Sequence, residues 1–225
     1  MIINHPETKN IPGLTALWMQ AFGDTEAFIE KFFSSGYSSH RCMVALEETT
    51  VVAALYWFDC IWEEKKIAYL YAIATDENHR GKGICNALMK YTHKHLQEQG
   101  YAGALLMPAE ESLESFYGKM GYGRIKPPAF SDTPQHKTAL WEAITPEEYL
   151  TLRQQYLPKG GVQHTLPALR YLSHFAKFYR FPGGICCGDP ALPMEYLPGY
   201  PGDPAMYLSF EVADQMPTYF ALPLA

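Results

Sequence analysis

Six consecutive residues, Arg80-Gly81-Lys82-Gly83-Ile84-Cys85, have the composition of a phosphate-binding turn. The two glycines let the backbone approach an anion closely, and Arg80 and Lys82 add cationic side chains. The turn begins a predicted helix, whose first N–H groups are unpaired and carry partial positive charge. The segment is therefore predicted to hold a pyrophosphate group, although an ordinary glycine-rich connection between a strand and a helix has the same composition.

The residues around this turn resemble the GNAT superfamily of acyl-CoA-dependent acyltransferases. The P-loop motif and the G-x-G-x-x-G fingerprint are both absent, which argues against nucleotide hydrolysis and Rossmann-type binding. Arg80–Cys85 is instead similar to the GNAT cofactor motif [QR]-x-x-G-x-[GA], within a matching stretch that starts at Tyr71. Phe116–Tyr122 resembles the second GNAT motif, a helix ending in F/L-Y-x-x-x-G-F/Y. The resemblance extends over about residues 11–125.

The resemblance implies acetyl-CoA as the cosubstrate and a place for it. Strand 67–74 is expected to splay from strand 104–107, with the acyl-CoA in the gap. Backbone groups near the end of the first strand would bond the pantetheine and the thioester oxygen, and the turn would hold the pyrophosphate. The cofactor-binding residues implied in this way are Ala72, Ile73, Ala74, Arg80, Gly81, Lys82, Gly83, Ile84 and Cys85.

The resemblance also places Tyr117 at the position of the family's general acid, which protonates the departing thiolate. An aromatic residue at this point of a helix is also explained by core packing. The general base is left open, because no carboxylate lies within 67–74, where many members carry one. The pairs Glu110-Glu111 and Glu63-Glu64 are candidates, although each is also explained as surface charge. Relay of the proton through water is the default expectation.

The sequence departs from the family pattern at two points. Cys85 stands where the family prefers Gly or Ala, and a thiol at a helix start is also a possible low-pKa nucleophile. Pro108-Ala109-Glu110-Glu111 stands where many members have Asn, so one side-chain contact to CoA is lacking. The spacing from Pro108 to Phe116-Tyr117 resembles the branch of enhanced-intracellular-survival acetyltransferases.

The elements predicted around these motifs alternate irregularly between helix and strand. Apolar spacing predicts helices over 11–22, 83–99 and 112–120, and a further helix capped by Asp24. This order is typical of a mixed α/β fold, here an α+β mixed sheet, and not of a βαβ repeat. Strands are predicted from β-branched and aromatic residues over 41–47, 51–62, 67–74 and 101–107.

The chain beyond residue 128 is predicted to form a C-terminal proline-rich α+β lobe on the acceptor side. Lys126-Pro127-Pro128 and Asp132-Thr133-Pro134 mark the boundary, giving a GNAT domain over 1–128 and the lobe over 129–225. Ten of the 17 prolines follow residue 157, so much of this part is expected to be loops. A helix start is predicted at Thr145-Pro146-Glu147-Glu148, a further helix over 167–179, and strands over 206–212 and 218–222.

Several residues that could carry other chemistry also have plain structural explanations. His95 falls on the apolar stripe of helix 83–99 and is predicted to lie in the core, whereas His93 is predicted to be solvated. Zinc ligation by the pair is disfavoured because residues i and i+2 point apart, and no metal site is predicted. The aromatic residues between Tyr56 and Trp62 line either an acceptor pocket or, more simply, the core.

Composition limits the class of protein. Hydrophobic residues make up 48% of the 225 residues, enough for a full core. The formal charge of −6 argues against nucleic acid as the main partner. The sequence has no apolar run of about 20 residues for a membrane span and no signal peptide at its start, so a cytoplasmic protein is expected. The five cysteines are odd in number and form no C-x-x-C pair, which predicts reduced thiols.

The prediction for function is an N-acetyltransferase that moves the acetyl group of acetyl-CoA to a primary amine of a small molecule or peptide, by direct attack. The alternative is a GNAT-fold module that binds acyl-CoA without turnover, as a sensor or interaction unit. The lack of a strand carboxylate at 67–74 keeps this alternative open. The acceptor is not specified by any motif, and a homodimer stays open as the assembly.

Overall fold

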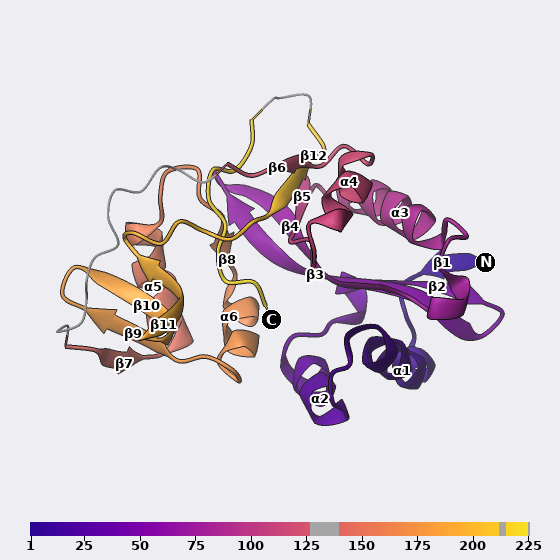
Figure 1. Cartoon of the computed structure of the whole chain (residues 1–225), viewed down its shortest axis with the longest axis horizontal. Coiled ribbons are helices and arrows are strands. Elements are labelled where there is room, and N and C mark those ends of the chain that lie inside the picture. Colours follow the sequence, from indigo (N-terminus) through magenta and orange to yellow (C-terminus); the bar gives the residue numbers. More distant parts are fainter. Residues whose placement is uncertain (127–139, 212–214, 225) are drawn as a thin grey trace.

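The computed structural model describes residues 1–126, 140–211 and 215–224 (Figure 1). In this part of the chain, eight strands form one sheet, in the order β1-β2-β3-β4-β5-β12-β6 with β8 paired to β3, and four form a second sheet in the order β11-β10-β9-β7. The strands are β1 Ile2–Asn4, β2 Cys42–Glu47, β3 Thr50–Trp62, β4 Lys65–Thr75, β5 Gly103–Leu106, β6 Gly123–Arg124, β7 Glu142–Ile144, β8 Gln163–His164, β9 Phe178–Phe181, β10 Gly184–Asp189, β11 Leu192–Leu197 and β12 Met206–Ser209.

Helices cover both faces of the large sheet. The helices are α1 Ile11–Phe22, α2 Glu26–Ser35, α3 Ile84–Glu98, α4 Ser112–Gly118, α5 Pro146–Tyr156 and α6 Leu166–Leu172. In Figure 1, α1 and α2 lie below the sheet and α3 and α4 lie above it. Strand β4 pairs with β5 in parallel and with β3 in antiparallel orientation, so the sheet is mixed. The predicted mixed α/β class is therefore confirmed.

Strand β3 is buried almost throughout because both of its faces are covered. Successive side chains point to opposite faces of a strand, and the two hydrophobic clusters divide accordingly. Ala54, Tyr56 and Phe58 pack with α1, α2 and α6, whereas Leu55 and Trp57 pack with α3 and α4. The aromatic residues predicted from this strand are therefore core residues.

The N-terminal helices agree with the sequence except at one cap. Helix α1 has its predicted bounds and ends at Gly23, which has a φ of 74°. The cap of α2 is Thr25, whose side chain accepts a hydrogen bond from the N–H of Phe28, and the prediction that Asp24 caps this helix is wrong. Thr and Asp are both common N-cap residues. The carboxylate of Asp24 does not cap the helix because it accepts a hydrogen bond from the indole N–H of Trp18.

Of the two histidines on α3, the more buried one is His93 and not, as predicted, His95. Burial lowers the pKa of His93 to about 4, and its Nε2 lies 2.8 Å from the hydroxyl of Tyr122. His95 instead lines a polar cavity beside Gln99. The prediction that His95 lies in the core and His93 in solvent was wrong, because strand β12 and the residues after it add a contact, with Phe210, on the His93 side of the helix.

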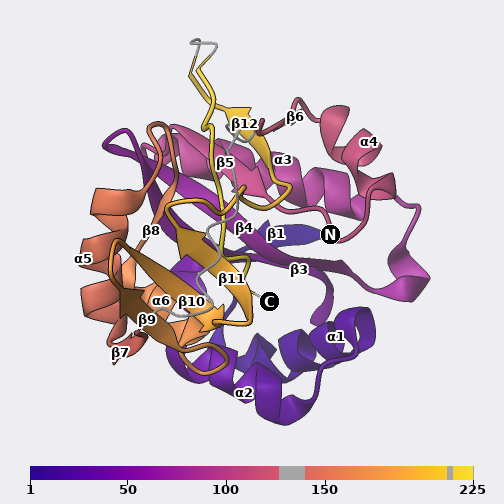
Figure 2. The ribbon, with the colours of Figure 1, turned by 60° about the vertical axis from the view of Figure 1, so that its left-hand side comes forward.

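The later part of the chain contributes to both sheets. Figure 2 shows β12 beside β5, where its register runs from Met206 opposite Leu106 to Ser209 opposite Gly103. Helix α5 begins with the predicted capping box at Thr145 and Glu148. The predicted boundary at residues 127–134 lies outside the described residues, as does Val212, and the division into a 1–128 domain and a 129–225 lobe stays a prediction.

Two C-terminal predictions need correction. The helix predicted over 167–179 ends at Leu172, and Phe178–Phe181 is strand β9, because its residues pair with β10 on one side and β7 on the other. The segment 218–222 is buried from Tyr219 onward but is not a strand: among the described residues it forms a single bridge, between Gly161 and Tyr219, and Leu222 has a φ of 65°. β10 follows β9 after the short turn at Pro182 and Gly183, so this hairpin is a local feature that the helix prediction missed. The other partners, β7 and Gly161, lie far from their pairing residues in sequence.

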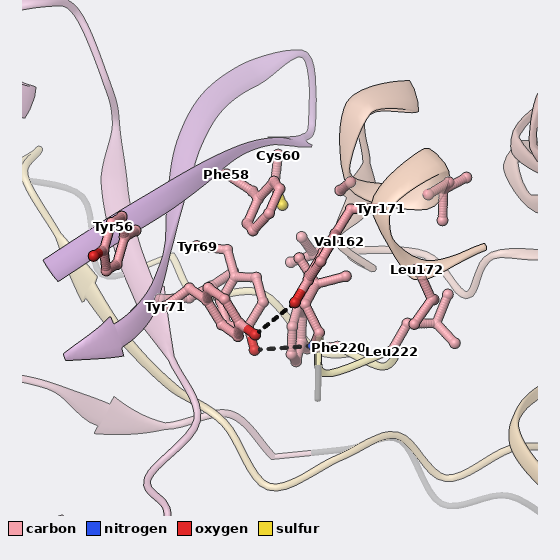
Figure 3. Close-up of a cluster of buried hydrophobic side chains, with 14 of the residues drawn as sticks. Tyr56, Phe58, Cys60, Tyr69, Tyr71, Val162, Tyr171, Leu172, Phe220 and Leu222 are labelled. Atoms are coloured by element: carbon pink, nitrogen blue, oxygen red, sulfur yellow. Dashed lines mark hydrogen bonds between the residues drawn. The ribbon is translucent and has the colours of Figure 1, made fainter. Parts of the chain in front are cut away.

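An aromatic cluster joins the large sheet to α6 and the C-terminal segment (Figure 3). The ring of Phe58 stacks on that of Tyr171 at 5.8 Å, and the hydroxyls of Tyr71 and Tyr171 share a hydrogen bond of 3.2 Å. The N–H of Leu224 donates to the hydroxyl of Tyr69. These contacts fix the C-terminal segment against β4.

Candidate active site

A bulge interrupts β4 at Ala72 and Ile73. Ala74 pairs with Ala54 and Tyr71 with Tyr56, so the two bulge residues lie opposite the single residue Leu55. Ala72 has a φ of 47°, a left-handed conformation that a non-glycine residue rarely adopts. Such a bulge bends the strand and frees backbone groups from the ladder.

The two central strands separate at this bulge. Parallel pairing between β4 and β5 runs from Ile67 with Gly103 to Leu70 with Leu106, where β5 ends. From Tyr71 onward, β4 has no ladder partner on that side among the described residues. The splay that the family resemblance implied is present, beyond the paired residues Leu70 and Leu106.

A cavity of about 370 Å³ opens where the strands separate. The bulge forms one wall, the residues after β5 form another, and α4 contributes Tyr117. The connection between α1 and α2 brings Asp24, and the C-terminal segment brings Pro223. Residues from five distant parts of the chain therefore meet at one point.

Tyr117 lies in this cavity in its protonated form. Its ring packs against those of Phe116 and Tyr122, and the residue is 7% exposed. Burial, with a smaller effect of Cys85, raises the pKa of Tyr117 well above its ordinary value. The hydroxyl therefore keeps its proton at neutral pH, as a general acid must. The residue is at once a packed aromatic ring and a donor at the cavity.

Asp24 is a carboxylate in the cavity that the sequence did not single out for chemistry. The indole Nε1 of Trp18 donates a 2.8 Å hydrogen bond to its Oδ2. A cationic or neutral amine that enters the cavity would meet this carboxylate. An Asp directly after a glycine C-cap has the pattern of a helix cap, so no local signal distinguished it.

The carboxylates proposed from the sequence as bases lie elsewhere. Glu63 and Glu64 form the turn between β3 and β4, about 25 Å along the strand from the bulge. Glu110 accepts a hydrogen bond from Ser112, and Glu111 lies 3.7 Å from the guanidinium of Arg124. All four are exposed, and none lines the cavity.

The glycine turn has the backbone geometry of an anion site. Gly81 and Gly83 have φ of 75° and 78°, and the space beside both Cα atoms is open. Gly83 caps α3 without a side-chain hydrogen bond, so the first N–H groups of the helix stay available to a ligand. Lys82 is exposed beside them. These features fit a pyrophosphate.

The other predicted cofactor residues differ in what they offer. Arg80 folds back, and its Nε donates to the carbonyl of Thr75 at 3.2 Å. Ile84 and Ala74 are buried, so only their backbone can take part. Burial raises the pKa of Cys85 to about 11, so the thiol is not a low-pKa nucleophile.

No group of His, Cys, Asp and Glu side chains suited to a metal ion occurs within residues 1–126, 140–211 and 215–224. All five cysteines are free thiols. None of the described helices combines the length and the apolar character that a bilayer span requires.

Comparison with known proteins agrees with this geometry. The model of the acetyltransferase (GNAT) domain matches residues 3–125. No curated protein matches the sequence significantly. The GCN5-related N-acetyltransferase from Kribbella flavida superposes with a TM-score of 0.66 at 14% identity, covering 88% of this chain and 57% of its own. Eis1 from Mycobacterium abscessus superposes with a TM-score of 0.61 at 15% identity, and the match covers 83% of this chain and 53% of Eis1.

These solved structures share the fold, and this chain spans a little over half of their length. The GCN5-related N-acetyltransferase from Anabaena variabilis ATCC 29413 is similar in the same way, with a TM-score of 0.59, 20% identity and coverage of 87% and 53%. The domain model covers more than half of the sequence. The chain therefore belongs to the GNAT acetyltransferase family.

Proposed function

We propose that the chain transfers the acetyl group of acetyl-CoA to a primary amine of a small molecule or peptide. The observation that carries this proposal is the cavity at the splay of β4 and β5, which holds a protonated Tyr117 and the carboxylate of Asp24. A proton donor and a proton acceptor in one cavity are what acyl transfer to an amine requires.

The residues present fit acetyl-CoA. The open turn at Gly81 and Gly83 suits the pyrophosphate, and the separated strands leave β4 backbone free beside the cavity. Acetyl-CoA would supply the activated acetyl group as a thioester. Lys82 adds a positive charge beside the turn, and Arg80, whose Nε donates to the carbonyl of Thr75, adds a second.

The chain's own groups divide the proton transfers between them. Asp24, held by Trp18, binds the incoming amine as a cation and accepts its proton, so that a neutral nitrogen can attack. Tyr117 donates its hydroxyl proton to the departing sulfur. The bulge residues Ala72 and Ile73 offer N–H groups to the charge that develops on the acyl oxygen.

The test is an assay for free thiol release from acetyl-CoA with a panel of amines, together with thermal melting. We expect acetyl-CoA, but not ATP or NAD, to raise the melting temperature, because a ligand that binds only the folded state stabilises it. At least one amine should then release CoA. Stabilisation by acetyl-CoA without turnover for any amine would favour the non-catalytic binding module instead.

Gly83→Asp is expected to weaken CoA binding by about tenfold or more, because a carboxylate at the start of α3 repels the pyrophosphate and blocks the backbone. Isothermal titration calorimetry measures the affinity. Gly100→Asp is the matched control, since Gly100 also has a positive φ, 77°, and open space beside its Cα atom, but lies at the other end of α3. Equal losses in both variants would show that backbone strain, and not the phosphate, is responsible.

A further inference from the structure

A second cavity, of about 550 Å³, lies at the opposite end of α3 from the glycine turn. Helix α3 runs from Ile84 to Glu98, so the two sites are about 20 Å apart along it. The walls come from the segment after β1, the turn before β2, strands β3 and β4, and the end of α3. We call it the histidine cavity, and its residues are His5, Ser38, His40, Arg41, Trp57, Asp59, Lys66, His95, Gln99 and Tyr101.

Positive charge exceeds negative charge in the histidine cavity. Asp59 is its only carboxylate among the lining residues, and two cations share it. Arg41 Nη1 lies 3.6 Å from Asp59 Oδ2, and Lys66 Nζ lies 3.5 Å from Asp59 Oδ1. Tyr101 also donates its hydroxyl to this carboxylate. The cavity therefore keeps one positive charge in excess before any histidine is protonated.

Arg41 has donor capacity that the described residues leave unused. Its Nε is buried and has no hydrogen-bond partner among them. A buried N–H without an acceptor costs free energy, and more so when the group is charged. Its separation from Asp59 is also longer than a hydrogen bond. An acceptor in the cavity would satisfy this guanidinium.

Three histidines surround the same space. The ring of His5 lies 4.9 Å from that of His95 and 5.9 Å from that of His40, measured between ring centroids. His5 Nδ1 lies 3.0 Å from the carbonyl of Ser39 and 2.9 Å from that of Cys42, so Nδ1 carries a proton. Its Nε2 can donate only when the ring is charged.

We propose that the histidine cavity binds a small phosphate-type oxyanion, with Arg41 and Lys66 as permanent cations and the three histidines as additional donors. An oxyanion offers several acceptors to a guanidinium, and it would satisfy the buried Nε of Arg41. The volume also admits a phosphorylated small molecule. The site is separate from the acetyl-CoA site and does not depend on the proposed transferase activity.

The direct test is calorimetric titration of the full chain with inorganic phosphate while saturating CoA occupies the cofactor turn. We expect one site, weakened about tenfold or more by Arg41→Gln, because a charge-assisted hydrogen bond is lost. Arg180→Gln is the matched control: it removes an arginine paired with Glu142 on the small sheet and should leave the affinity unchanged. Absence of phosphate binding, or equal weakening by both variants, would overturn the proposal.

His40→Gln provides a second variant in case Arg41→Gln fails to fold, because His40 is exposed. Sulfate is used for the pH dependence because its charge is constant between about pH 6 and pH 8, so a change in its affinity reports protonation of the protein and not of the ligand. The titratable and charged groups facing the histidines are Arg41, Asp59, Lys66, Tyr101 and, beside His95, Glu98. Burial, and then His5, lowers the pKa of His95, so this ring becomes protonated only at a lower pH than an ordinary histidine.

We expect sulfate to bind more tightly at about pH 6 than at pH 8, and His40→Gln to reduce that difference. The same sulfate affinity at both values would contradict the role of the histidines. Titration with a sugar phosphate, compared with inorganic phosphate, shows whether the natural anion is free or part of a larger molecule. Tighter binding than inorganic phosphate points to a phosphorylated molecule, and equal or weaker binding points to free phosphate; both results support the site.

Discussion

Replacing Tyr117 by Phe is expected to lower turnover about 100-fold or more while the affinity for acetyl-CoA stays nearly constant. The substitution keeps the ring and its packing against Phe116 and Tyr122, and removes only the hydroxyl. The expected loss is the usual scale for a general acid. Burial keeps this hydroxyl protonated at neutral pH, so the proton that it would donate is present throughout the working range. Steady-state kinetics of thiol release measure the effect.

Asp24→Asn is the companion variant, because it acts on the amine and not on the leaving group. We expect it to raise the KM for the amine and to lower turnover most at low pH, where the amine is charged. Melting temperatures of both variants separate chemistry from folding. If the Tyr117 hydroxyl serves only the fold, the Phe variant loses about 1 kcal/mol of stability and keeps its rate. That result would remove Tyr117 from the mechanism.

The sequence predicted those elements of the fold whose signals are local. The spacing of apolar residues gave α1 its bounds, and Thr145 with Glu148 gave the start of α5. It did not predict that Phe178–Phe181 is a strand, because one partner, β7, lies far away in sequence and the hairpin to β10, through Pro182 and Gly183, was missed. Strand β12 was located, but nothing local indicated that it pairs with β5 and β6.

The candidate site divides in the same way. The glycine turn and Tyr117 lie in short motifs, and the structure places the turn at the start of α3 and Tyr117 in the cavity. Asp24 could not be found from the sequence, because its position in the cavity follows from the packing of α1 against β3 and β4. The histidine cavity was missed for a similar reason: its residues come from five segments that only the folded sheet brings together.

A buried ion-pair network anchors the C-terminal segment that borders the candidate active site. Arg153 on α5 donates from Nε and Nη2 to Glu195 on β11, both at 2.8 Å, and both side chains are fully buried. The hydroxyls of Tyr149 and Tyr219 also donate to Glu195. Arg153 Nη1 donates further to the carbonyl of Val162 at 2.8 Å. The network thus connects both sheets through α5 and leads, beyond Tyr219, toward the cavity.

Glu195→Gln is expected to reduce the free energy of unfolding by about 3–5 kcal/mol, because it leaves the Arg153 charge buried without a counter-charge. Urea unfolding measures the loss as a lower midpoint. Burial alone would raise the pKa of Glu195, but the charge of Arg153 and the hydrogen bonds from Arg153, Tyr149 and Tyr219 lower it. The stabilisation is therefore full at neutral pH and is lost as the pH falls through this lowered pKa. The control is Glu142→Gln, which breaks the exposed pair with Arg180 and should leave the midpoint unchanged.

The double variant Arg153→Met/Glu195→Met removes both charges together and should recover much of the stability, since an apolar pair of similar volume replaces the ions. A double variant as unstable as the single one would show that the hydrogen bonds to Val162 and the tyrosines, and not the unpaired charge, account for the loss.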